Sequence, residues 1–140
     1  MTGSRVPVEV GSTAPVLHRR IELVDMVAYA GATWDWHRMH YDPGFAAEKR
    51  LPAPVVDGQV FGALLVEQLQ DWLGPGASVR ALSFRFKSLV FAGDTVRCES
   101  EVVAVDDDEA SLSCRVVAIG PDGSERVAVG PAAATVRWRR

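Results

Sequence analysis

The chain has 140 residues, 48% of them hydrophobic, and a net charge of −3 at pH 7, which favours one globular domain over residues 1–140. The net acidity argues against a nucleic-acid partner, because a nucleic-acid interface needs a basic face. The sequence has neither the pattern of a signal peptide nor an apolar stretch of membrane-spanning length, so we expect a cytoplasmic protein without a membrane partner. Cys98 and Cys114 share no motif spacing, which favours buried, reduced thiols.

The N-terminal quarter has weak periodicity. Residues 1–13 are mostly small or polar, and we expect a loose lead-in there. An extended segment follows at 16–21, and then a short helix over 26–32 with Asp25 as its N-cap. The residues that this pattern makes available to a core are Val24, Val27 and Ala28.

The stretch from Val55 to Leu73 predicts one long, mostly buried helix. Asp57 is a suitable N-cap or first-turn residue, and Gly74-Pro75-Gly76 ends the pattern. Gly58 and Gly62 lie four residues apart, and each costs a helix about 1 kcal/mol relative to alanine. We therefore expect these glycines to permit close approach of a strand or a ligand. The apolar residues at i, i+3, i+4 and i+7 spacing are Val60, Phe61, Leu64, Leu65, Leu69, Trp72 and Leu73.

After the helix, the hydrophobic period changes to two, which predicts strands. Four strand segments follow, around 82–86, 96–104, 112–118 and 127–138, and we expect a four-stranded antiparallel meander. A sheet with one apolar face must bury that face, and the long helix is the one element apolar enough to cover it. The pattern predicts an α+β fold with a curved sheet around one helix.

The segment 34–42 holds two His, two Asp and an Arg. If the segment folds back as a loop, Asp35 and His40 can face one cleft, where a carboxylate and an imidazole can activate water and move a proton. The local pattern equally fits a structural role, with Asp35 capping the next turn and His40 packed in the core. His37 and His40 could instead bind a metal with Asp35 or Asp42. We expect no metal site, because no further ligands stand out.

Asp57 and Gly58 begin the long helix, where free backbone N–H groups can hold a polarised carbonyl oxygen. The alternative is that Asp57 caps its own helix. The two roles conflict, because an Asp bound to those N–H groups would compete with a substrate oxygen.

Three motifs in order resemble the MaoC-like hot-dog-fold dehydratases, a family that includes the (R)-specific enoyl-CoA hydratases. The resemblance covers about residues 25–105. The motifs are Asp35-x-x-x-x-His40-x-Asp42, then Pro54-Val55-Val56-Asp57-Gly58-Gln59, then the strand–turn–strand stretch from Leu82 to Val96 with Gly93-Asp94 in its turn.

The resemblance implies a hot-dog fold, with five antiparallel strands around the long helix. It implies that Asp35 and His40 are the catalytic pair that hydrates a trans-2-enoyl thioester to an (R)-3-hydroxyacyl thioester. The Gly58 N–H would polarise the thioester carbonyl, with Asp57 in the same substrate-binding region. The supporting residues would be Asp42 and Arg38.

The same resemblance implies an acyl-CoA substrate, no cofactor, and a homodimer with each site near the subunit interface. Some relatives of this kind work instead as hetero-oligomers with a second hot-dog chain. Asp57 departs from the family, which usually has His there, and Leu89 replaces a usual Pro. The alternatives are a hot-dog thioesterase that uses Asp57 or Glu67, and a subunit that acts only with a second chain.

Overall fold

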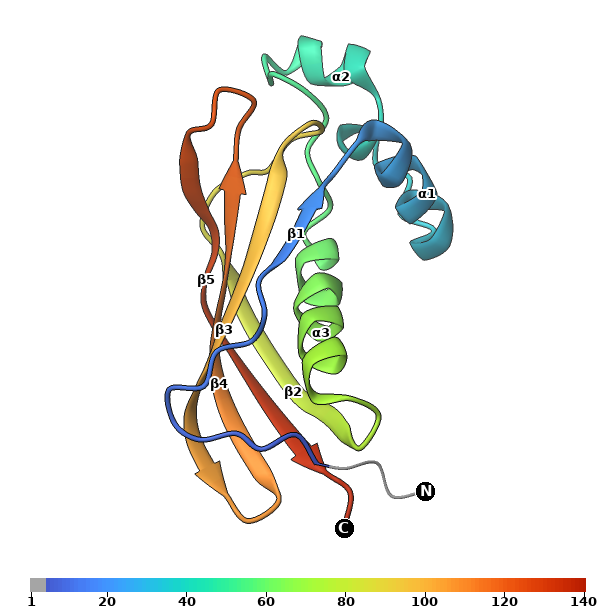
Figure 1. The fold of residues 1–140 in the computed structure, drawn as a ribbon. Helices are drawn as coiled ribbons and strands as arrows, with labels where there is room; N and C mark the ends of the chain where they lie inside the picture. Colours follow the sequence, from blue (N-terminus) through green and yellow to red (C-terminus); the bar gives the residue numbers. More distant parts are fainter. Residues whose placement is uncertain (1–4) are drawn as a thin grey trace.

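The computed structural model describes residues 5–140 and contains a five-stranded antiparallel sheet with one long helix along one face (Figure 1). Two short helices lie at one end of this arrangement, beyond the start of the long helix. The α+β architecture predicted from the periodicity is confirmed. The elements in chain order are β1 (Leu17–Arg20), α1 (Leu23–Thr33), a 3-10 turn (Arg38–His40), α2 (Pro43–Glu48), α3 (Gln59–Leu73), β2 (Ala77–Phe86), β3 (Thr95–Asp106), β4 (Glu109–Ile119) and β5 (Glu125–Trp138).

The strand order in the sheet is β1-β3-β4-β5-β2. Strands β3, β4 and β5 form a meander, but β2 pairs with β5 and not with β3. The predicted four-stranded meander is therefore wrong for β2. The physical reason is the connection 87–94, which carries the chain from one edge of the sheet to the opposite side before β3 begins. β2 is left as an edge strand.

The core lies between α3 and the concave face of the sheet. The side chains of Leu65 and Leu69 are fully buried, as are the inward positions of the meander. Cys98 and Cys114 are free and buried, as predicted. Gln68 of α3 is polar but only 2% exposed. Its amide donates to the carbonyl oxygen of Cys98 at 2.8 Å, and Ser100 donates to its oxygen at 2.8 Å, which satisfies the buried polar group.

The two helix glycines permit close approach of β2, as expected. A Cβ added at Gly62 would lie 2.9 Å from the ring of Phe84. A Cβ added at Gly58 would overlap the ring of Phe86. Both rings project from β2 onto α3, so the glycines set the distance between the helix and the sheet edge.

Helix α1 differs from its prediction. It begins at Leu23, and its N-cap is Glu22; Asp25 is in the first turn and accepts a hydrogen bond from the Glu22 N–H at 2.9 Å. Val24 is 70% exposed and Val27 41% exposed, so the predicted core face is wrong. α1 touches the rest of the molecule along a narrow strip only. The buried residues of this strip are Met26 and Ala30.

The predicted loose lead-in is held to the sheet over part of its length. Residues 1–4 lie outside the described residues, and 5–13 contain no helix or regular strand. The Gly11 N–H nevertheless donates to the Val102 carbonyl at 2.9 Å, and Thr13 forms a bridge with Glu101. Within residues 5–140, no helix has the length and apolar character needed to cross a membrane.

Candidate active site

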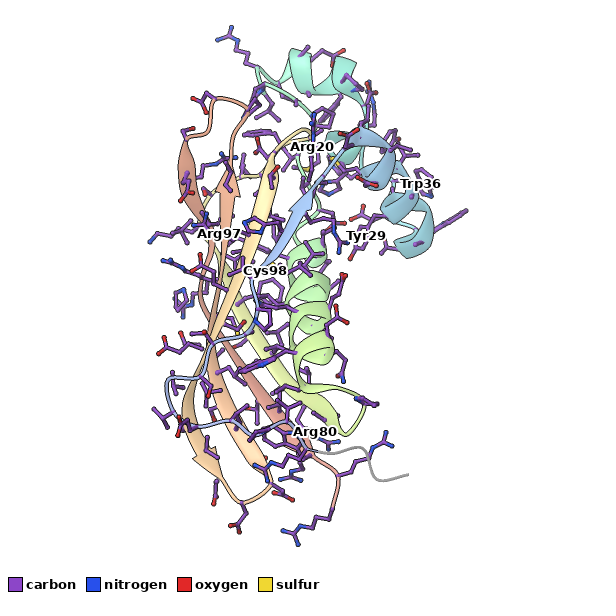
Figure 2. The ribbon with its side chains drawn as sticks, viewed as in Figure 1. Arg20, Tyr29, Trp36, Arg80, Arg97 and Cys98 are labelled. Atoms are coloured by element: carbon purple, nitrogen blue, oxygen red, sulfur yellow. The ribbon has the colours of Figure 1, made fainter. Side chains whose placement is uncertain are left out.

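The segment 34–42 forms a loop between α1 and α2. Trp34 ends α1 in the left-handed conformation with φ of 60°, which turns the chain away from the helix axis. Trp36 packs edge-on against Tyr41, with ring centroids 5.8 Å apart. Figure 2 shows Trp36 beside α1, at the outer side of this loop. The aromatic contacts hold the loop in one shape at the surface.

Asp42 and Arg38, predicted as supporting residues, fix the loop to α2. One oxygen of Asp42 accepts hydrogen bonds from the backbone N–H groups of Gly44 at 2.9 Å and Phe45 at 3.1 Å. The other accepts from Arg38 Nε at 2.9 Å. The Phe45 N–H, followed by Arg38, lowers the pKa of Asp42. Asp42 is therefore a charged helix cap.

His40 is oriented by the segment that precedes α3. Its Nδ1 lies 2.8 Å from the carbonyl oxygen of Val55. A carbonyl oxygen accepts only, so Nδ1 carries the hydrogen and Nε2 of the neutral ring is an acceptor. The Val55 N–H in turn donates to the carbonyl of Met39 at 2.8 Å. These two contacts fix the ring with Nε2 on its free side.

Asp35 lies on that free side. Its Oδ2 is 3.8 Å from His40 Nε2, a separation longer than a direct hydrogen bond. The side chain of His40 is 15% exposed and that of Asp35 is 47% exposed, so the pair is reached through Asp35. The His37 backbone N–H lowers the pKa of Asp35, and the charge of His40 adds to this. Asp35 is thus a carboxylate at neutral pH.

Asp57 joins this pair from the start of α3. Its Oδ1 accepts a hydrogen bond from the Gln59 N–H at 3.0 Å. The N-cap is Gly58, and its own N–H donates to no protein acceptor within residues 5–140. Asp57 therefore supports the helix through Gln59 while the Gly58 N–H stays open. The two roles that conflicted in the sequence are compatible in the structure.

Two hollows meet at His40. The larger, about 330 Å³, is lined by His40, Gly58, Phe61 and Phe86, with the loop 87–90 at its rim. A small hollow of about 10 Å³ is also lined by His40, together with Asp35 and Asp57. A third hollow of about 390 Å³, along β3 and β4, includes neither Asp35 nor His40.

The rim of the larger hollow is held by an ion pair between the buried Asp94 and the half-buried Arg126. Arg126 Nη2 lies 2.6 Å from Asp94 Oδ2 and 2.8 Å from the carbonyl oxygen of Leu89. Asp94 also accepts a hydrogen bond from the Phe91 N–H at 2.9 Å. Arg126 lies on β5, far along the chain from the loop, so only the folded structure identifies this contact.

Several residues of the site carry no signal in the sequence. Tyr29 lies between α1 and α3 (Figure 2) and lines the small hollow. Val55 acts through its backbone carbonyl, which no side-chain pattern indicates. The helical spacing of α1 could have placed Tyr29 on the face of Met26, but it could not show what that face meets.

The metal-ligand set considered in the sequence does not assemble. His37 Nδ1 accepts a hydrogen bond from the Met39 N–H at 3.1 Å. Within residues 5–140, the group of carboxylate and imidazole atoms close enough for one ion is Asp35, His40 and Asp57, all within 4.8 Å of one another. This geometry also suits a proton-transfer site, and exposed acidic groups of this kind are common without a metal.

Comparisons with known proteins give consistent results. The family model described as "MaoC like domain" matches residues 8–119. The chain is 36% identical over 118 residues to an (R)-specific enoyl-CoA hydratase of Aeromonas caviae, covering 80% of this chain and 85% of the relative. It is 30% identical over 98 residues to the 3-oxo-4,17-pregnadiene-20-carboxyl-CoA hydratase beta subunit of Mycobacterium tuberculosis, covering 70% and 76%.

Solved structures share the fold. The (R)-hydratase from A. caviae involved in PHA biosynthesis superposes with a TM-score of 0.83 at 32% identity, covering 94% of this chain and 98% of that chain. The ChsH1–ChsH2 complex of M. tuberculosis contains a chain with a TM-score of 0.81 at 26% identity, covering 95% and 100%.

Proposed function

The chain belongs to the family of MaoC-like domains, and on this basis we propose that it is a hydro-lyase that reversibly hydrates a trans-2-enoyl thioester to an (R)-3-hydroxyacyl thioester. The observation that carries the proposal is the Asp35–His40 pair. Its atoms lie 3.8 Å apart at the junction of two hollows, beside the open N–H of Gly58. The relatedness to an (R)-specific enoyl-CoA hydratase supports the same reaction.

The geometry assigns a role to each end of the substrate. The thioester carbonyl oxygen accepts from the Gly58 N–H, which stabilises the negative charge that develops there. The carbons C2 and C3 then lie near His40. The water oxygen bonds to C3, one water proton goes to the Asp35–His40 pair, and the π electrons pass through the enolate. The pair then returns one proton to C2, so the enzyme is unchanged.

The fixed tautomer of His40 favours this exchange. Because Nδ1 donates to the Val55 carbonyl, Nε2 can accept a proton and give it back without rotation of the ring. Asp35, ionised at neutral pH, stabilises the imidazolium that results. The proton taken from the water is then held between the His40 ring and the Asp35 carboxylate.

We further propose an acyl-CoA substrate and assembly of the chain as a homodimer. The acyl and thioester portions fit the hollow of about 330 Å³, whose walls include Phe61 and Phe86. The unpaired edge strand β2 and the exposed side chains of Phe86 (61%) and Leu89 (51%) support an interface on this side. Assembly with a second hot-dog chain is the alternative, since one similar structure is a ChsH1–ChsH2 complex.

The thioesterase alternative depends on Asp57 or Glu67 as the carboxylate. Glu67 is bound by Arg19 at 2.7 Å, and both side chains are well exposed. It lines neither of the two hollows that meet at His40. The position of Glu67 leaves Asp57 as the carboxylate on which the thioesterase alternative depends.

The direct test is hydration of crotonyl-CoA, which is measured by the loss of the enoyl absorbance. Free thiol is measured in the same samples. We expect turnover without thiol release, and a loss of about 10²- to 10⁴-fold in kcat for Asp35→Asn and for His40→Ala. His18→Ala and Asp71→Asn are matched controls, because both residues lie outside the two hollows that meet at His40. Wild-type turnover by an Asp35→Asn/His40→Ala double variant, or release of thiol as the main product, would contradict the proposal.

A further inference from the structure

The small hollow beside the Asp35–His40 pair has room for one water molecule. Its volume is about 10 Å³, and one buried water needs about 10–15 Å³. Part of its wall is apolar, formed by Met26, Ala30 and Val60. The remaining wall is polar, so the hollow has both the size and the chemistry of a site for a single ordered water.

The spacing of the polar groups fits a shared water. The ligand atoms of Asp35, His40 and Asp57 all lie within 4.8 Å of one another. Two acceptors that each bind one hydrogen of the same water at about 2.8 Å lie about 4.5 Å apart. The two carboxylates and the free Nε2 of His40 are all acceptors, so a water in this hollow can give one hydrogen to the Asp35–His40 pair and the other to Asp57.

Asp57 is held so that one of its oxygens remains available. Oδ1 accepts from the Gln59 N–H at 3.0 Å, which fixes the carboxylate at the start of α3. Burial, and then the negative charge of Asp57, raises the pKa of Tyr29, which lines the same hollow. Asp57 thus lines the small hollow with one oxygen that is not engaged by the Gln59 N–H.

We propose that Asp57 is a third catalytic residue, which binds the reacting water together with Asp35 and His40 and aims it at C3 of the enoyl thioester. This inference rests on the proposed hydratase function. One hydrogen of the water points to the Asp35–His40 pair, which accepts it as the O–C3 bond forms. The other hydrogen stays on the oxygen, bound to Asp57, and becomes the hydroxyl hydrogen of the product. Asp57 accepts a hydrogen bond and takes up no proton.

The role predicts a specific kinetic effect. Loss of the hydrogen bond that the water donates to the Asp57 carboxylate lowers kcat, because the attacking oxygen is then poorly oriented. Binding of the acyl-CoA is unaffected, since Asp57 lines the small hollow and not the larger one. A residue with a purely structural role at the start of α3 would instead change binding and stability along with turnover.

The experiment compares Asp57→Asn, Asp57→Ala and the control Asp71→Asn in the full-length protein. Three quantities are measured for each: kcat for crotonyl-CoA hydration, the Kd of unreactive butyryl-CoA by calorimetry, and Tm. We expect kcat to fall by about 10- to 100-fold in Asp57→Ala, with the Kd of butyryl-CoA within threefold of wild type. Asp57→Asn retains an oxygen for the Gln59 N–H, so its Tm should match that of Asp71→Asn while its kcat is reduced.

The outcomes separate the two proposals. An active wild-type protein whose Asp57 variants keep kcat within threefold would overturn the role of Asp57 and leave the hydratase function standing. A parallel loss of kcat and of butyryl-CoA binding in Asp57→Asn would also overturn it, because that result indicates a structural residue. An inactive wild-type protein that binds butyryl-CoA would overturn the hydratase function itself, and this inference with it.

Discussion

Single residues of the site are positioned by backbone groups more than by other side chains. The carbonyl of Val55 sets the tautomer of His40, and the N–H of His37 holds the carboxylate of Asp35 at 3.2 Å. The open N–H of Gly58 is the third such group. Backbone groups carry no signature in the sequence, which explains why the candidate residues could be named but their orientations could not.

Substitution of His37 tests whether its backbone N–H lowers the pKa of Asp35. The first cause of its lowered pKa is the hydrogen bond from the His37 N–H. The φ of His37 is −64°, a value that proline adopts without strain. His37→Pro removes the N–H, so we expect the pKa of Asp35 to rise toward its ordinary value, measured by carboxyl carbon NMR during a pH titration.

His37→Ala is the matched variant for this titration, because it removes the imidazole but keeps the N–H. Its Asp35 pKa should remain below the ordinary value. Activity that needs the Asp35 carboxylate is present above the pKa of this group and is lost as the pH falls through it. The His37→Pro enzyme should therefore lose hydration activity at a higher pH than the His37→Ala enzyme. Equal acid limits for the two variants would contradict this assignment.

Among the elements, α3 contributes both to the core and to the site. Its period of hydrophobic residues was clear in the sequence, and the buried residues Leu65 and Leu69 follow it. Its beginning was less well predicted: the helix starts at Gln59, with Gly58 as N-cap, so Asp57 precedes it. The predicted stretch began at Val55, four residues earlier, and the shift of the N-cap from Asp57 to Gly58 matters because the Gly58 N–H has no protein acceptor within residues 5–140.

Substitution of Gly62 by alanine tests the contact between α3 and β2. Alanine in a helix gains about 1 kcal/mol over glycine, but its Cβ here would lie 2.9 Å from the half-buried Phe84 ring. Overpacking costs about 1–3 kcal/mol. We expect Gly62→Ala to lower the free energy of unfolding by up to about 2 kcal/mol, measured by urea denaturation.

The control for this substitution is Gly31→Ala in α1, where the new Cβ would be 3.7 Å from Trp36, an ordinary contact. We expect that variant to be stabilised by up to about 1 kcal/mol. Shortening the neighbour in Gly62→Ala/Phe84→Leu should recover part of the loss. Stabilisation by Gly62→Ala alone would show that the ring does not restrict the helix.

For the whole molecule, the sheet order determines where a partner can bind. β1 and β2 are the two edge strands, and β2 is the longer, at 10 residues against 4. A long unpaired edge is a template for pairing with another chain. The rim of the larger hollow, at residues 87–90, directly follows this edge strand, so a partner bound there would lie next to the proposed site.

Light scattering during size-exclusion chromatography tests this arrangement. We expect a mass of about twice 15.2 kDa for the wild-type protein. Leu89 is 51% exposed beside this edge, and an aspartate there would place an unpaired charge in the interface. Leu89→Asp should shift the mass toward 15.2 kDa.

Val103 is equally exposed, at 51%, but lies on β3 within the sheet, so Val103→Asp is the matched control and should remain a dimer. A wild-type protein that is monomeric at micromolar concentration would contradict the homodimer. In that case, a dimer that forms only with a second hot-dog chain would support the hetero-oligomer.

The sequence by itself determined the α+β class, the long helix, the buried cysteines and the family, because these depend on local periodicity and short motifs. The hot-dog architecture is confirmed by the structure and by its similarity to the A. caviae hydratase. Tertiary structure alone decided that β2 pairs with β5, since periodicity defines which face of a strand is apolar but not which strand lies beside it. It alone also decided that Asp57 meets Asp35 and His40, because hydrogen bonds of Met39 and His40 to Val55 hold the loop 34–42 against the segment that precedes α3.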